Sequence, residues 1–196
     1  MNFIQKIASA AALACGAAGT FAAQPAPFYG EASVGVSSFN ADCGDGINCD
    51  DSDVGFRALG GFRFGDMFSV EAGYLDFGKL TYSAAGNGLQ ISASTKTSGP
   101  FIAGAYHVDL MPKLDMTARL GAYYGMNKSS CSGSCSTVGL ARSQKENKLK
   151  PYFGVGAYYE VIRGLSVGGS LDLAEAMSFG DSGSVVLLGA SVRYAF

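Results

Sequence analysis

The only histidine of the sequence, His107, is the one side chain of the usual general-base type. Hydrolysis or acyl transfer normally requires such a base beside a nucleophile or an activated water molecule. A lone histidine near the end of a structural element is more often a structural residue than a catalytic one. The sequence therefore does not predict an enzyme.

Four cysteines form two local pairs, Cys43 with Cys49 and Cys131 with Cys135. Zinc sites usually combine two close ligand pairs, often with histidines among them. Only Cys131 and Cys135 have such a spacing, and no histidine lies near either pair. We therefore expect two disulfides that staple loops, with pairing between the two segments as an open alternative. No metal centre and no cofactor is predicted.

The segment 40–53, which holds the first cysteine pair, is rich in aspartate. Its carboxylates are ligands of the type that Ca²⁺ prefers, but their spacing does not match an EF-hand. We expect a plain solvated loop, and Ca²⁺ binding stays open.

The elements that position these residues have a period of two. In Ser184–Phe196, every second residue from the end of the chain is apolar, and the opposite face is small, polar or charged apart from Leu187. Such alternation predicts a strand and not a helix. An apolar face turned outward over a polar interior is the pattern of a transmembrane β-barrel.

Ionisable residues fall on the polar face of each predicted strand. An arginine that faces lipid at the midplane costs roughly 2–4 kcal/mol, so this sorting favours a polar lumen. Both signs of charge occur there, and we expect ion pairs that plug the lumen; a narrow conduit is the alternative. The predicted lumen residues are Glu31, Arg57, Arg63, Glu71, Asp115, Arg119, Glu160, Asp172 and Arg193.

From Phe28 onward the chain divides into about eight such strands, connected alternately by short turns and long polar loops. The sequence thus predicts an all-β fold, an antiparallel up-and-down transmembrane β-barrel of about eight strands. Phe39 is out of phase with the apolar face of the first strand, which we expect to end before it. Short turns are predicted at Gly65, Asp109 and Arg163, and long loops at 40–53, 76–95, 127–147 and 175–183.

Residues 1–22 have the pattern of a secretory signal peptide, with Lys6, a small apolar stretch and a cleavage point after Ala22. The predicted barrel domain is then 23–196, and export through an oxidising periplasm favours the disulfides. An uncleaved anchor and lipidation at Cys15 are the alternatives. The short turns and both ends of the barrel are expected on the periplasmic side, as is His107.

Three blocks resemble the OmpA-like and opacity-protein-like families of small outer-membrane barrels. These blocks are Gly60–Phe64, Phe68–Gly78 and the terminal Tyr194-Ala195-Phe196. The resemblance implies localisation in the bacterial outer membrane and surface roles such as adhesion or envelope integrity. It also implies that Tyr194 and Phe196 act as the signal read by the barrel assembly machinery. We do not expect the activity of the peptidoglycan-binding domain that follows the barrel in full-length OmpA-type proteins.

Partners follow from this setting. We expect outer-membrane lipid and lipopolysaccharide, the assembly machinery, and a host or surface ligand that binds the loops. The net charge of −2 does not suggest nucleic acid, which would call for a basic patch. The third loop and its exit are basic and either meet lipopolysaccharide phosphates or are simply solvated. Their basic residues are Lys128, Arg142, Lys145, Lys148 and Lys150.

Overall fold

The computed structural model describes residues 27–40, 48–86, 89–133, 143–178 and 181–196. The predicted signal peptide, Cys43 and Cys135 lie outside these ranges. In the described ranges, no helix is both long enough and apolar enough to cross a membrane.

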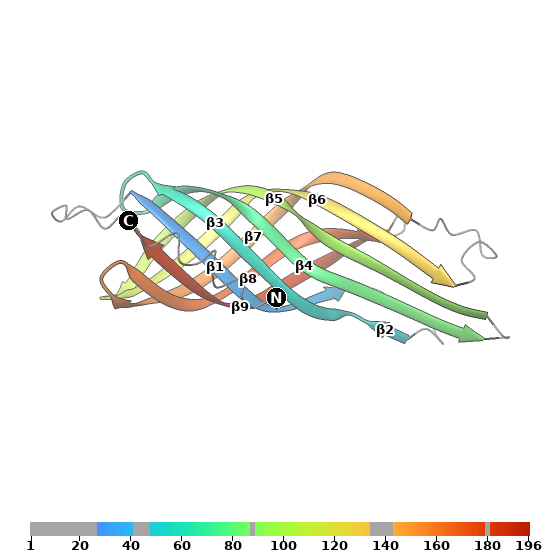
Figure 1. The fold of residues 1–196 in the computed structure, drawn as a ribbon. Coiled ribbons are helices and arrows are strands. Elements are labelled where there is room, and N and C mark those ends of the chain that lie inside the picture. The colour runs from blue at the N-terminus through green and yellow to red at the C-terminus, as the bar shows by residue number, and fades with distance from the viewer. Residues whose placement is uncertain (1–26, 41–47, 87–88, 134–142, 179–180) are drawn as a thin grey trace, which may run out of the picture.

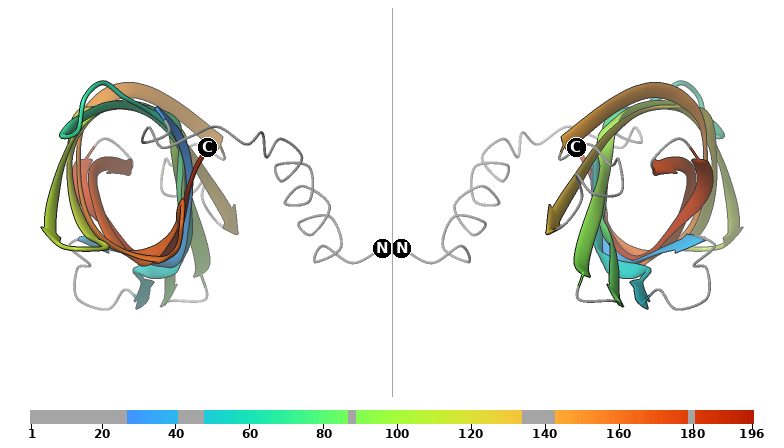
Figure 2. Two further views of the ribbon diagram at one scale, coloured as in Figure 1. Left: turned by 90° about the vertical axis from the view of Figure 1, so that its left-hand side faces the viewer. Right: turned by 90° about the vertical axis from the view of Figure 1, so that its right-hand side faces the viewer.

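The chain forms a closed antiparallel β-barrel of eight long strands (Figures 1 and 2). Each of the eight long strands pairs with the next long strand along the chain, and the last of them, β9, pairs with the first, β1, to close the ring. The short strand β2 continues the line of β3 along the outer part of β4. The strands are β1 (Phe28–Asn40), β2 (Asn48–Asp50), β3 (Ser52–Arg63), β4 (Phe68–Gly86), β5 (Leu89–Met111), β6 (Leu114–Gly133), β7 (Ser143–Ile162), β8 (Leu165–Ser178) and β9 (Asp181–Ala195).

The register makes the strands tilt around the barrel. A path that follows the paired residues from strand to strand leaves β1 at Tyr29 and, after one turn around the barrel, returns to β1 at Phe39. Such a stagger requires tilted strands, and eight strands leave an interior that side chains can fill. The path runs through Gly61, Glu71, Ala103, Gly121, Tyr152, Ala174 and Val185.

Three short connections lie at one end of the barrel, which we call the turn end; the opposite end is the loop end. Each short connection contains a residue with positive φ: Gly65 at 84°, Lys113 at 75° and Gly164 at 81°. Glycine adopts this conformation without the steric cost that a Cβ brings, which explains why two of the turns use it. These turns agree with those predicted near Gly65, Asp109 and Arg163.

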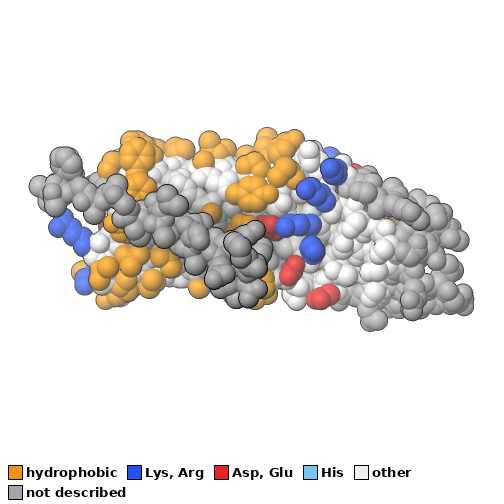
Figure 3. All heavy atoms as spheres, in the orientation of Figure 1, with side chains coloured by type: hydrophobic (Ala, Val, Ile, Leu, Met, Phe, Trp, Pro, Cys, Tyr) orange, Lys and Arg blue, Asp and Glu red, His pale blue; other side chains and the backbone are white. Residues whose placement is uncertain are grey.

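Large apolar side chains cover the outside of the barrel in a broad belt. Val34, Leu120 and Leu188 are about 60% exposed, and aromatic residues such as Phe62 and Tyr159 are among the other members. Figure 3 shows this belt over the part of the barrel that includes the turn end. Exposed apolar surface on this scale is unstable in water and stable against lipid, as the outward alternation predicts.

The strands extend farther toward the loop end than the sequence predicted. The predicted loop 76–95 is largely strand, because β4 continues to Gly86 and β5 starts at Leu89. The predicted loops 127–147 and 175–183 are shortened in the same way by β6, β7, β8 and β9. Beyond the belt the outward face of a strand is polar and the inward face includes apolar residues, so the alternation that marks a membrane strand is lost while backbone pairing continues.

The expected end of the first strand before Phe39 was also wrong. β1 runs on to Asn40, and Phe39 points inward with 4% of its surface exposed. Its phase is that of the inward residues Tyr29 and Glu31. At this height the barrel interior is apolar, so an apolar residue belongs on the inner face.

Candidate functional site in the barrel lumen

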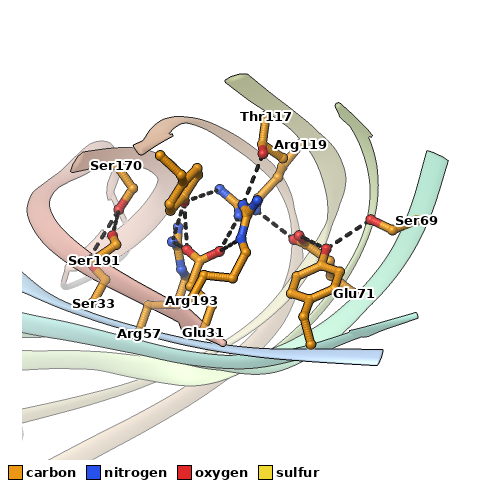
Figure 4. A network of polar contacts seen from close by, with 12 residues as sticks. Glu31, Ser33, Arg57, Ser69, Glu71, Thr117, Arg119, Ser170, Ser191 and Arg193 are labelled. Carbon is orange, nitrogen blue, oxygen red and sulfur yellow. Dashed lines mark hydrogen bonds and ion pairs between the residues drawn. The ribbon is translucent and has the colours of Figure 1, made fainter. Parts of the chain in front are cut away.

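Glu31 of β1 is the centre of a charge network that crosses the lumen (Figure 4). Its carboxylate accepts hydrogen bonds from Arg57, from Arg119 Nη2 at 2.8 Å and from Arg193 Nε at 3.0 Å. The Tyr158 hydroxyl donates a further bond at 2.6 Å. The side chains of Glu31, Arg57 and Arg119 are fully buried, and that of Arg193 is 5% exposed.

Each arginine also reaches a second carboxylate. Arg57 binds Asp172, which accepts a bond from the Tyr152 hydroxyl at 2.5 Å. Arg119 Nε donates to Glu71 at 2.6 Å. Buried charges are stable only when they are paired and hydrogen-bonded. Each of these side chains has at least one charged partner, while Arg57 Nε and Asp172 Oδ2 are buried without a hydrogen bond among the described residues. We call Glu31, Glu71, Asp172, Arg57, Arg119 and Arg193 the ionic layer.

Arg193 links the ionic layer to a group of polar residues at the turn end. Its Nη1 atom donates to Asp115 at 2.8 Å and its Nη2 atom to Thr117 at 2.9 Å. Its guanidinium lies 3.7 Å from the centroid of the Tyr158 ring, a close cation–π contact. Arg63 approaches Asp115 less closely, with 3.8 Å between nitrogen and oxygen.

His107 belongs to this turn-end group. Its Nε2 atom lies 2.9 Å from the Ser69 hydroxyl, and its Nδ1 atom lies 3.3 Å from Asp115. Serine, histidine and aspartate thus stand in the order of a hydrolase triad. However, Ser69 is 1% exposed and its hydroxyl also bonds Tyr29 at 2.9 Å, so a substrate has no access to it in this structure.

Eight of the nine predicted lumen residues are therefore brought together, and Glu160 is the exception. In the part of the chain that the structure describes, Glu160 pairs with no basic side chain. Its Oε1 atom accepts a hydrogen bond from the Gly164 backbone nitrogen at 3.0 Å. Glu160 lies next to the β7–β8 turn, so a local turn contact replaces the expected ion pair.

An apolar layer fills the lumen on the loop-end side of the ionic layer. Leu75 and Phe77 follow Glu71 along β4, and Tyr123 follows Arg119 along β6, all with no exposed surface. The rings of Phe77 and Tyr123 meet edge to face with centroids 5.9 Å apart. The remaining large members are Phe39, Leu80, Phe101, Tyr152, Val185 and Leu187.

The sequence did not predict this apolar layer or the role of the tyrosines. Tyr29 and Tyr158 lie on the same inward phase as the charged residues, and that phase was the available signal. Tyr29 donates to Glu71 at 2.5 Å, in the same way as Tyr158 and Tyr152 bind their carboxylates. Phenol donors thus supply hydrogen bonds that the arginines leave open.

The other predicted residues lie elsewhere. Tyr194 and Phe196 stand outside the barrel at the turn end, 47% and 63% exposed, with ring centroids 6.2 Å apart. Cys131 is buried near the loop end of β6, and nothing is described for the side chain of Cys49. The two cysteine pairings stay predictions. Among the described residues, no group of three His, Cys, Asp or Glu is arranged to hold a metal ion.

Comparison with known proteins identifies the architecture. The model of the family described as OmpA-like transmembrane domain matches residues 23–169. No curated protein matches the sequence.

Solved structures with the same fold are distant in sequence. Ail, the attachment invasion locus protein of Yersinia pestis, is 15% identical with a TM-score of 0.55, covering 87% of this chain and 100% of its own. Neisserial surface protein A is 16% identical with a TM-score of 0.53, covering 89% and 100%. OprG of Pseudomonas aeruginosa is 12% identical with a TM-score of 0.53, covering 88% and 98%. At these identities the likeness establishes the fold alone.

Proposed function

Because the chain belongs to the OmpA-like transmembrane domain family and is a β-barrel of the bacterial outer membrane, we propose that it is a non-enzymatic barrel with a closed lumen. Its role is to present the loop end at the cell surface for structural or adhesive contacts. The turn end then faces the periplasm, as in other outer-membrane barrels.

The observation that carries the proposal is the ionic layer around Glu31. Three arginines from β3, β6 and β9 converge on one carboxylate of β1, and every side chain of this group is at most 5% exposed. Opening a path for ions would separate these charges from their partners, which costs several kcal/mol for each buried ion. The apolar layer adds a second barrier, since Leu75, Phe77 and Tyr123 fill this part of the lumen with side chains that have no exposed surface.

The extended strands support a role of the loop end in contacts with other molecules. β4, β5, β6 and β7 continue beyond the apolar belt as paired strands, which gives the loops a rigid support. We propose that disulfides between Cys43 and Cys49 and between Cys131 and Cys135 staple two of these loops. Lipopolysaccharide, the barrel assembly machinery and a host or surface ligand are the proposed partners.

The closed lumen is tested by solute efflux from vesicles. The refolded mature protein, checked by its heat-dependent shift in gel mobility, should release no entrapped small sugar faster than empty vesicles do. The Glu160→Gln variant, altered outside the ionic layer, should behave identically. Rapid efflux through the wild-type barrel would instead support the alternative function, a narrow channel for small solutes.

A further inference from the structure

Four lysines stand side by side on the outer wall of the barrel toward its loop end. The register pairs Lys79 of β4 with Lys96 of β5, Lys96 with Lys128 of β6, and Lys128 with Lys145 of β7. All four side chains point outward, because the residues next to them along their strands point inward. These neighbours are Leu80 beside Lys79, Thr95 beside Lys96, and Asn127 and Ser129 beside Lys128; Glu146, next to Lys145, lies on the opposite face of β7. We call these four residues the lysine row.

Such a row is unfavourable for the barrel alone. Like charges directly opposite each other on neighbouring strands repel and destabilise the sheet. Among the described residues, acidic side chains offset only one end of the row: Asp76 pairs with Lys96 at 2.7 Å, and Asp53 accepts a bond from the Lys79 backbone nitrogen at 2.7 Å. Lys128 and Lys145 have no ion pair among the described residues.

The lysine row lies at the height of lipid headgroups. Tyr124 of β6 pairs with Leu149 of β7 at the outer edge of the apolar belt, and Lys128 follows Tyr124 with one outward residue, Met126, between them. This separation is about 13 Å along a strand, or about 10 Å along the membrane normal at a tilt of about 40°. Figure 3 shows basic side chains gathered where the belt ends.

Hydroxyl groups form a second row, one step farther from the membrane. Thr81 pairs with Ser94, and Ser94 pairs with Ser130, whose hydroxyl lies 3.0 Å from that of Ser94. A wall with cations nearest the membrane and hydroxyls beyond them matches a lipid whose phosphates lie near its acyl chains and whose sugars extend outward.

We propose that the outer wall of β5, β6 and β7 binds a phosphorylated glycolipid of the outer leaflet, a lipopolysaccharide-type molecule. The ammonium groups of Lys128 and Lys145 contact its phosphates, and the hydroxyls of Ser94 and Ser130 contact its sugars. This site lies outside the lumen and is independent of whether the barrel conducts. It rests on the proposed function for one point, the orientation of the barrel that turns the loop end toward the outer leaflet.

The test measures binding of diphosphorylated lipid A to the refolded full chain in detergent, with monophosphorylated lipid A for comparison. Each lysine near an anionic surface contributes about fivefold in affinity, so K128Q/K145Q should weaken binding about 25-fold. K128R/K145R should retain binding. The matched control K113Q/R163Q removes two exposed charges at the turn end and should bind as the wild type does.

A second measurement separates a lipid site from a phosphate site and from a purely structural row. Without lipid, the single variant K128Q should be at least as stable as the wild type, because it removes like-charge repulsion. Inorganic phosphate at the same concentration should not displace lipid A. Equal binding by K128Q/K145Q and the wild type, equal loss in the control, or displacement by phosphate alone would each overturn the proposal.

Discussion

The Glu31→Gln substitution should weaken the barrel more than any other single change of a carboxylate to an amide. Glutamine keeps the shape of Glu31 but removes the charge that Arg57, Arg119 and Arg193 share, and it turns a donor group toward these donors. Removing one partner of a buried ion pair costs about 3–5 kcal/mol. Each arginine keeps a second acceptor, so we expect a loss of unfolding free energy at the lower end of this range, about 3 kcal/mol.

The assay is equilibrium unfolding by guanidinium in phospholipid vesicles, followed by circular dichroism and by gel mobility. Tryptophan fluorescence is not an option, because the sequence contains no tryptophan. Glu160→Gln is the matched control, since it makes the same chemical change at a residue whose contact is a turn hydrogen bond. Glu160→Gln should lose no more than about 1.5 kcal/mol of unfolding free energy. If Glu31→Gln loses no more unfolding free energy than Glu160→Gln does, the hydrogen bonds of Glu31 do not stabilise the barrel as the account requires.

Three further changes follow from other parts of the barrel. Gly35→Ala should reduce refolding yield, because its Cβ would overlap the backbone of β9, whereas Gly60→Ala faces open space and should refold as the wild type does; equal yields would contradict this. Tyr158→Phe should lose about 1–3 kcal/mol of unfolding free energy because it removes one hydrogen bond to Glu31 and the acceptor of Arg119 Nη1; no loss would show that the phenol is not needed. Phe196→Ala should slow assembly in cells but refold normally in vitro, and normal levels in cells would argue against an assembly signal.

The sorting of charges to the inside was predictable, while their pairing was not. The two-residue period of a strand assigns Glu31 to the polar face of β1, and Arg193 to the polar face of β9, without any knowledge of the fold. Which carboxylate meets which arginine depends on the stagger that brings Tyr29 into line with Phe39 around the barrel. That stagger is a property of the closed sheet and is not encoded in any single strand.

The errors at the loop end have one physical cause. A sequence reveals a membrane strand through the contrast between its lipid face and its lumen face. Above the belt that contrast disappears: Thr81 and Ser94 face water, and inward positions such as Phe39 are apolar. Alternation therefore stops or inverts where backbone pairing continues, and the strands were predicted too short.

Single-channel conductance of the refolded wild-type barrel in a planar bilayer tests the closed lumen most directly. We predict no conductance steps from a preparation that is folded by gel mobility, because the ionic layer and the apolar layer both block the path. Steady steps that change in Glu71→Gln or Arg119→Gln barrels would contradict the account, since they would place an ion path through the ionic layer itself.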